Sequence, residues 1–264
     1  MSSKVKLKNI KNGAHQYMID FLGLCVQNLI TTLKYIFDRN TKFSAVISKA
    51  AMISYDSLPI ALTIVFIAAV VISLQVSKQF LLSGAESYVG GFLAVALIRE
   101  IAPGFAALAI SARAGTAISA EIANMKVTSQ VDAIKTLKVD PIGYYFAPRV
   151  ISAAITVPMV IILAELFGII GGMIVSYASI GLHPNRYMNS VWLWINTKDI
   201  YVSLLKGCIF GILITVVCAT QGYTTEGGAK NVGISTTEAA IKSTVYLLIA
   251  DLIIAILFYH NSSY

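Results

Sequence analysis

Charge is scarce in this sequence of 264 residues, of which only 12% are Asp, Glu, Lys or Arg and 57% are hydrophobic. A soluble domain carries about a quarter charged residues. The mean hydropathy is +0.76. This balance excludes an ordinary soluble domain and predicts an integral membrane protein.

Patterns for catalysis and for nucleotide or metal binding are also lacking. The three cysteines and three histidines are scattered, so they form neither a disulfide framework nor a metal-ligand cluster. The chain contains no G-x-x-x-x-G-K-[ST], G-x-S-x-G or H-E-x-x-H. We therefore expect a chain that is not an enzyme and binds no metal or cofactor by itself.

The apolar runs predict an all-α fold with five membrane-spanning helices, at residues 58–76, 88–118, 150–180, 201–219 and 239–259. Before them, apolar residues recur every three or four positions over 14–37, which predicts an interfacial amphipathic helix. Residues 14–37 could alternatively form a sixth span. That span would place basic clusters on both sides of the membrane, against the tendency of basic residues to lie on the inner side. The expected division is a basic N-terminus with the interfacial helix (1–57) and a domain of five spans (58–264).

Two local signals refine these elements. Pro103-Gly104 predicts a kink or break in the second span. The glycine- and threonine-rich stretch 220–237 predicts a loop, and Ser235 with Glu238 resembles a capping box that starts the last helix.

Basic residues predict the orientation. With the N-terminus, 121–149 and 220–242 inside, the inner side holds 14 Lys and Arg and the outer loops hold three. The net charge of +7 therefore fits anionic lipid headgroups, and no nucleic acid partner is expected.

Ionisable residues inside the spans are costly and mark candidate functional positions. They are Arg99, Glu100, Glu165, Lys206 and Asp251. The depths of Lys206 and Asp251 differ by only about 5 Å, so an ion pair between adjacent helices is expected. These ions either lock the helices together or line a polar cavity that responds to substrate.

The second span then becomes rich in small residues between 107 and 120, which lets helix backbones approach closely. This run serves either ordinary packing within the chain or a moving or subunit-facing surface. The residues assigned to close packing and to a pivot are Pro103, Gly104, Arg113, Gly115 and Glu121.

A short amphipathic helix is predicted over 128–138, on the inner side. Thr128 or Ser129 would cap it, Asp132 can pair with Lys135, and Asp140-Pro141 would end it. Its apolar side chains are Val131, Ile134 and Leu137. On the residues alone, the helix either lies on headgroups or docks into a partner.

The stretch from Leu97 to Arg149 resembles the signature of MlaE-type (YrbE- and TGD-like) permeases, the membrane subunits of lipid-transporting ABC systems. The pattern RE-x-x-P, A-x-R-x-G-[ST]-A-[IL]-[ST]-A-E, M-[KR]-[VA]-T-x-Q-[IVL], VDP and PR is almost unbroken. Further agreement comes from SLPI at 57–60, FGIIGG after Glu165, LLKGCIFG around Lys206, GYTTEGGAKNVGISTT at 222–237 and Asp251-Leu252. The composition also resembles a plastid-encoded or cyanobacterial member.

The resemblance implies a homodimer of permeases in a bacterial inner membrane or plastid inner envelope. Each permease would sit on a separate ABC ATPase subunit that uses ATP-Mg, and an MCE-domain lipid-binding protein would lie on the outer side. By matching position, 128–138 would be the coupling helix, with Thr128, Gln130, Val131, Asp132, Ile134, Lys135, Leu137, Asp140 and Pro141 as its docking residues.

The expected function is therefore the movement of phospholipid or a related lipid between membranes, driven by the partner ATPase. Two alternatives remain at the level of sequence. One is a proton-coupled secondary transporter that uses Glu100, Glu165 and Asp251, and the other is a membrane scaffold that transports nothing.

Overall fold

The computed structural model describes the backbone of residues 2–38 and 41–259 and the side chains of residues 18–38 and 41–259. Within these ranges the chain is helical and has no strand. The helices are α1 (Ser2–Phe37), α2 (Phe43–Leu82), α3 (Val89–Ala96), α4 (Ala102–Ile110), α5 (Thr116–Val127), α6 (Gln130–Thr136), α7 (Pro141–Ile180), α8 (Pro184–Trp194), α9 (Thr197–Tyr223) and α10 (Ala229–Tyr259). A 3₁₀ turn, η1 (Glu86–Tyr88), precedes α3, and two π-helical turns, η2 (Leu97–Ile101) and η3 (Ser111–Gly115), separate α3, α4 and α5.

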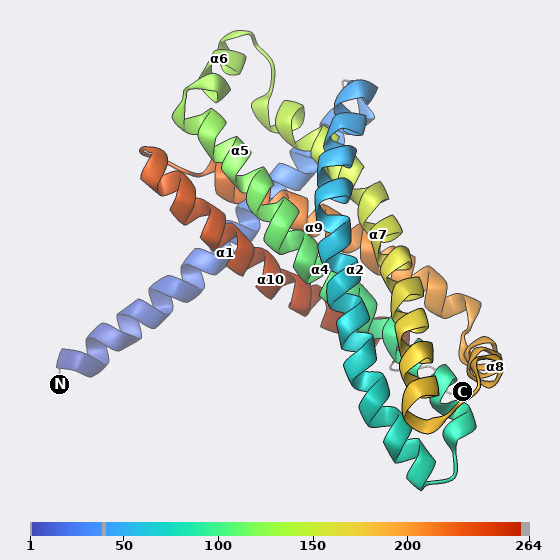
Figure 1. Cartoon of the computed structure of the whole chain (residues 1–264). Helices are drawn as coiled ribbons and strands as arrows, with labels where there is room; N and C mark the ends of the chain where they lie inside the picture. The colour runs from blue at the N-terminus through green and yellow to red at the C-terminus, as the bar shows by residue number, and fades with distance from the viewer. Residues whose placement is uncertain (1, 39–40, 260–264) are drawn as a thin grey trace.

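Five helical segments are long and apolar enough to cross a membrane, which confirms the predicted number of spans. They are α2, the continuous segment Glu86–Val127, α7, α9 and α10, and α1 is not among those found in the described residues. Figure 1 shows α2 and α7 side by side, with α6 near one end of the bundle and α8 near the other. Helix α9 is central, since it contacts α7, α5 and α10.

The helices extend well beyond the predicted spans. Helices α2 and α7 each contain 40 residues. Such a helix is about 60 Å long, twice the thickness of a hydrocarbon core. Hydropathy marked the apolar part of each helix but not its ends, because helix α2 continues through residues 43–57 with Val46 and Ile53 buried against the bundle.

Helix α1 is longer than predicted, and both apolar and polar side chains pack it against the bundle. It begins at Ser2 rather than Ala14. Its buried residues are Phe21, Cys25, Asn28 and Thr32, and the Asn28 amide donates to Thr220 Oγ1 of α9 at 3.0 Å. The apolar side chains of Met18, Leu22 and Leu33 are more than 40% exposed. An interfacial amphipathic helix would turn such residues toward lipid, and that placement stays a prediction. The hydrogen bond to α9 is a contact that a hydrophobicity pattern does not register.

The predicted loop at 220–237 is mostly helix. Helix α10 begins at Ala229, so only 224–228 separates it from α9. The capping box was wrong: Ser235 lies inside α10, where its hydroxyl donates to the Gln221 carbonyl at 3.1 Å and accepts from Thr225 at 2.7 Å. Serine and threonine hydroxyls can disfavour a helix because they compete for its backbone hydrogen-bonding groups. Here the Ser235 hydroxyl instead donates to a carbonyl of the neighbouring helix α9.

The small-residue run packs within the chain. Ser111 lies 2.5 Å from Ser243 of α10, hydroxyl to hydroxyl. A Cβ added at Gly115 would lie 2.8 Å from Cys218 Sγ of α9. The run therefore fills the space beside α9 and α10, as ordinary close packing requires.

Candidate functional site

The ion-bearing part of the second span is a π-helical turn, η2, placed directly before Pro103. A kink or break was predicted at Pro103-Gly104, but the helical segment Glu86–Val127 is continuous: residues 97–101 form the π-helical turn, and Pro103 lies in the first turn of α4. A proline has no N–H and crowds the carbonyl four residues earlier, which here is that of Arg99. The Lys206 ammonium donates to this carbonyl oxygen at 2.7 Å. The proline thus frees a backbone acceptor, and a buried lysine from α9 occupies it.

Lys206 also joins two carboxylates. Its Nζ lies 2.8 Å from Glu100 Oε2 and 2.6 Å from Asp251 Oδ1 of α10. The predicted Lys206–Asp251 contact is therefore present, and Glu100 is a second partner that depth alone did not identify. The lysine side chain is fully buried, whereas that of Glu100 is 45% exposed. One cation thus holds α3–α4, α9 and α10 together, and one of its carboxylates also faces outward.

Arg99 forms a separate ion pair with Asp199 of α9. Its Nε lies 2.8 Å from Asp199 Oδ1 and its Nη2 3.3 Å from Oδ2, a bidentate geometry. Asp199 also closes the capping box of α9 with Asn196. The Arg99 guanidinium stacks over the Tyr259 ring, 4.7 Å from its centroid. The C-terminal end of α10 is thereby fixed to α9 through Arg99.

Glu165 of α7 is not part of either cluster. It is buried and accepts a short hydrogen bond from the Ser203 hydroxyl of α9. The sequence analysis missed Asp199 and Ser203, although a signal was available. Asp199, Ser203 and Lys206 follow one another at spacings of four and three, so one face of α9 carries all three partners of the intramembrane ions.

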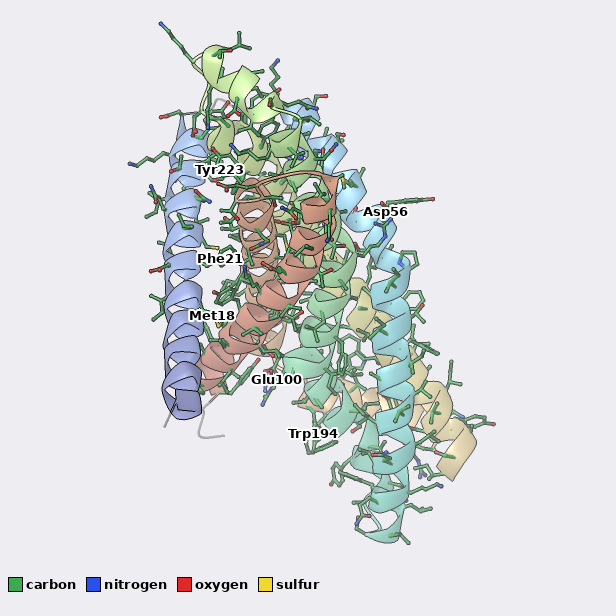
Figure 2. All side chains as sticks on the ribbon, turned by 90° about the vertical axis from the view of Figure 1, so that its left-hand side faces the viewer. Met18, Phe21, Asp56, Glu100, Trp194 and Tyr223 are labelled. Atoms are coloured by element: carbon green, nitrogen blue, oxygen red, sulfur yellow. The ribbon has the colours of Figure 1, made fainter. Side chains whose placement is uncertain are left out.

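A cavity of about 360 Å³ lies beside these ions. Arg99, Glu100, Trp194 and Tyr259 line it together with apolar residues of α3 and α10. Glu100 and Trp194, which both line this cavity, are labelled in Figure 2. The lining of this cavity contains no cysteine, serine or histidine that could act as a nucleophile. Apolar walls with an ionic rim suit an amphiphilic ligand rather than a covalent reaction.

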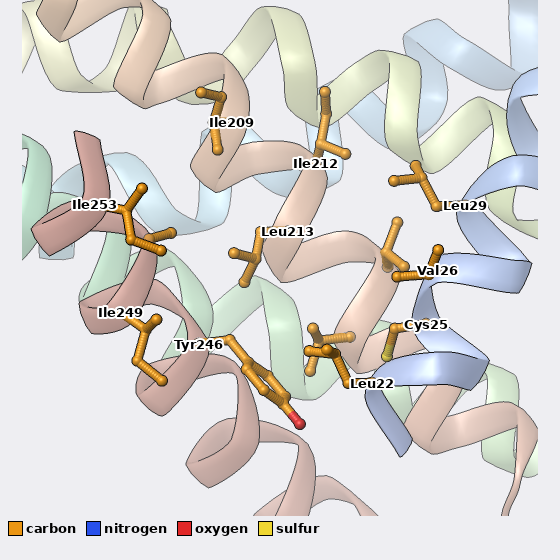
Figure 3. A pocket seen from close by; sticks show the side chains of 13 residues that line it. Leu22, Cys25, Val26, Leu29, Ile209, Ile212, Leu213, Tyr246, Ile249 and Ile253 are labelled. Atoms are coloured by element: carbon orange, nitrogen blue, oxygen red, sulfur yellow. The ribbon is translucent and has the colours of Figure 1, made fainter. Parts of the chain in front are cut away.

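A second, wholly apolar groove of about 400 Å³ lies between α1, α9 and α10. Figure 3 shows Leu22 and Val26 of α1 facing Ile209 and Leu213 of α9 across this groove. It contains no ion, although Tyr246 closes one side and its hydroxyl donates to the Met18 carbonyl at 3.3 Å.

The other residues predicted for packing and pivoting lie apart. Gly104 faces Asp251, because a Cβ added there would lie 3.8 Å from Asp251 Oδ2. Arg113 pairs with Asp56 of α2 at 3.4 Å, with both side chains more than 40% exposed. Glu121 belongs to a separate ion cluster with Lys49 and Arg149 rather than to the site around Lys206.

The predicted coupling helix is α6, which is shorter than expected. It spans Gln130–Thr136, and Ser129 precedes it in the left-handed region (φ 60°) without a side-chain cap. Thr128 Oγ1 donates to the Asn124 carbonyl of α5 instead. The Asp132–Lys135 ion pair is present at 3.5 Å. Asp140 does not end α6: it caps α7, accepting from the amides of residues 142 and 143, and Pro141 is the first residue of α7.

The apolar residues of α6 point in different directions. Val131 is fully buried and Ile134 partly buried against the bundle, whereas Leu137, just after the helix, is 73% exposed. Gln130, Asp132 and Lys135 are exposed as well. The helix is therefore anchored by Val131, and its outer surface is open.

Among the described residues, no group of three His, Cys, Asp or Glu side chains could hold a metal ion. The site of the described residues consists of ion pairs and apolar walls.

The permease MlaE family model matches residues 46–257. A probable ABC transporter permease of Rickettsia prowazekii is 35% identical over 216 residues, 82% of this chain and 83% of that protein. A Synechocystis protein of the same description is 35% identical over 211 residues, 80% of each chain. The chloroplastic protein trigalactosyldiacylglycerol 1 of Arabidopsis thaliana is 33% identical over 190 residues, 72% of this chain and 54% of that protein.

Proposed function

The chain belongs to the MlaE family of ABC transporter permeases, and on that premise we propose that it moves phospholipid or a related lipid between membranes, driven by a separate ATPase subunit. It is an integral membrane protein, and its relatives come from bacteria and from chloroplasts, which fits a bacterial inner membrane or a plastid inner envelope. The name of the Arabidopsis relative refers to a galactolipid, which supports a lipid as the substrate class.

The observation that carries the proposal is the outward face of Glu100. A carboxylate at this depth is costly when lipid tails surround it, so such groups face a water-filled cavity or another subunit. Glu100 is 45% exposed on the single chain and lines the cavity of about 360 Å³. A second copy of the chain facing it would enclose these ions in a central cavity, as the homodimer of our proposal requires.

In this cavity the apolar walls receive lipid tails, and the ions act on the polar headgroup. Glu100 and Asp251 share one lysine, so the three groups carry one net negative charge when all are ionised. Arg99 is held by Asp199 at the cavity edge, where it can offer a positive charge to a phosphate. An MCE-domain protein on the outer side would receive or supply the lipid.

The partner ATPase binds ATP-Mg and supplies the energy. In the proposal its closure moves α6, whose buried Val131 transmits the displacement to the bundle. Helix α5 connects α6 to the π-helical turn η3, and α4 connects η3 to η2. These turns, η3 and η2, carry Gly115 and Glu100, and we assign the pivot to them and to Pro103-Gly104. Rotation there would open or collapse the cavity.

The decisive experiment replaces the outward carboxylate. We expect Glu100→Gln to reduce ATP-dependent transfer of a fluorescent phospholipid at least tenfold in proteoliposomes that contain the permease with its co-purified ATPase. The variant should still bind the ATPase, because Glu100 is far from α6. Glu226→Gln, the same change at an exposed residue outside the spans, is the control and should transfer lipid normally.

The same assay separates the alternatives. Transfer that continues without ATP and stops with a protonophore would replace the proposal with a proton-coupled transporter. No transfer by the unaltered complex and no co-purifying lipid would replace it with a scaffold.

A further inference from the structure

At the opposite end of the bundle from the ion site, near α6, lies a basic cavity of about 380 Å³. The start of α2, the end of α5 and the start of α7 form its walls, and Tyr35 of α1 closes one side. This is the end that the distribution of Lys and Arg places at the inner membrane surface.

An ion cluster forms the floor of the cavity. Lys49 Nζ lies 2.6 Å from Glu121 Oε1, and Arg149 Nη2 lies 2.7 Å from Glu121 Oε2. Two cations therefore share one carboxylate. Arg149 is 2% exposed, and its Nη1 donates to the Tyr145 carbonyl at 2.5 Å. With two cations and one carboxylate, the floor of the cavity carries one excess positive charge.

Two further features point to a missing anion. Lys42 lines the same cavity and makes no ion pair with any residue that the structure describes. Arg149 Nε and Thr41 Oγ1 are buried and have no hydrogen-bond partner among the described residues. Unsatisfied donors of this kind are costly and usually mark an absent ligand or water. Among the described residues, Glu121 is the only acid that lines the cavity, and Asp140 in the link before α7 uses its carboxylate to cap that helix.

The apolar part of the lining decides between anions. Ala45, Met125, Pro148 and the ring of Tyr144 share the cavity with the cations. Aromatic residues beside basic ones are typical of the membrane interface, and basic pockets between helices at the inner surface bind anionic headgroups. A free inorganic anion would have no use for the apolar walls.

We propose that the cavity lined by Lys42, Lys49 and Arg149 binds the phosphate of an anionic phospholipid from the inner leaflet. This site is separate from the intramembrane ions and does not depend on transport. Val139, in the link between α6 and α7, also lines the cavity, so a bound headgroup contacts the segment that carries α6.

Binding can be measured by native mass spectrometry of the full chain in a zwitterionic detergent. The probes are dioleoyl phosphatidylglycerol, dioleoyl phosphatidylcholine and inorganic phosphate. We expect preferential binding of phosphatidylglycerol over phosphatidylcholine. Lys42→Gln should weaken phosphatidylglycerol binding about fivefold, the effect of one basic residue near an anionic surface. Lys42 has no ion-pair partner in the described chain, so this change should leave the fold intact.

Lys34→Gln is the matched control, because Lys34 is an exposed lysine of α1 near the same end that does not line the cavity. It should leave binding unchanged. Competition by inorganic phosphate would support a site for the phosphate group itself, and binding of lipid without competition would support a site that also needs the acyl chains. Equal weakening by Lys34→Gln and Lys42→Gln, or equal binding of both lipids, would overturn the proposal.

Discussion

At the scale of single residues, the strongest constraint is a lysine with no exposed surface. Lys206 makes contacts with Glu100, Asp251 and the Arg99 carbonyl. Removing the lysine would leave its carboxylate partners without a counter-charge. The loss of stability would then exceed what the ion pairs themselves contribute. The three contacts therefore act as one unit.

The unit can be tested by a double-mutant cycle. We expect Lys206→Ala to lower the free energy of unfolding by about 3–5 kcal/mol, because it strands two carboxylates. Asp251→Ala in the Lys206→Ala background should cost less than in the unaltered chain, since its partner is already gone. Unfolding in mixed detergent micelles gives both values. Additive losses would mean that the two residues do not interact.

The ion contacts differ in how far a sequence can predict them. The Lys206–Asp251 contact could be predicted because the two residues lie at similar depths along their spans. Glu100 as a partner could not, because depth along a span does not tell which way a side chain points, and Glu100 lies in a π-helical turn. The predicted fourth span begins at residue 201, so Asp199 and its capping role in α9 lay outside it.

At the scale of elements, α6 combines an anchor with an open surface. Val131 is fully buried and Leu137 is 73% exposed. A substitution of Val131 by a charged residue would damage the fold and could not report on a partner. The exposed residues are the ones that can test coupling.

We therefore expect Leu137→Asp to reduce co-purification of the ATPase at least fivefold without changing thermal stability. Val131→Ala should do the reverse, lowering stability by about 1–2.5 kcal/mol through the loss of buried methyl groups while still binding the ATPase. Pull-down and thermal unfolding of both variants measure the difference. Normal ATPase recovery by Leu137→Asp would remove this residue from the docking surface.

Element identity was predictable, whereas element ends were not. Five apolar runs gave five spans because apolar residues must be contiguous to cross a bilayer. Residues 229–237 belong to the stretch expected to be a loop, yet they are helical, and Ser235 and Ala239 are buried against neighbouring helices. Packing between distant segments overrode local propensity there, and one sequence does not display that packing.

At the scale of the whole molecule, the least buried span is α10. Its exposed residues include Leu248, Leu252 and Ile256, which recur every four positions and so lie on one face of the helix. Leu252 directly follows Asp251 of the ion site. In our proposal a second copy covers this face.

Disulfide cross-linking tests that arrangement. A Leu252→Cys variant, with Cys25, Cys208 and Cys218 replaced by Ala, should form a covalent dimer in membranes under mild oxidation. Leu166→Cys on α7 is the control, since Leu166 is also about half exposed but lies on another helix. Cross-linking of both variants to the same extent would indicate random collision rather than a specific interface.

The outward carboxylate of Glu100 also has a consequence for biogenesis. A newly inserted single chain exposes this group to lipid, and hydrocarbon strongly disfavours a charge. Cells that degrade unassembled membrane subunits could recognise such a chain by this one side chain. The level of the protein in the membrane would then follow the supply of its assembly partners, because only an assembled chain hides the residue that marks it for removal.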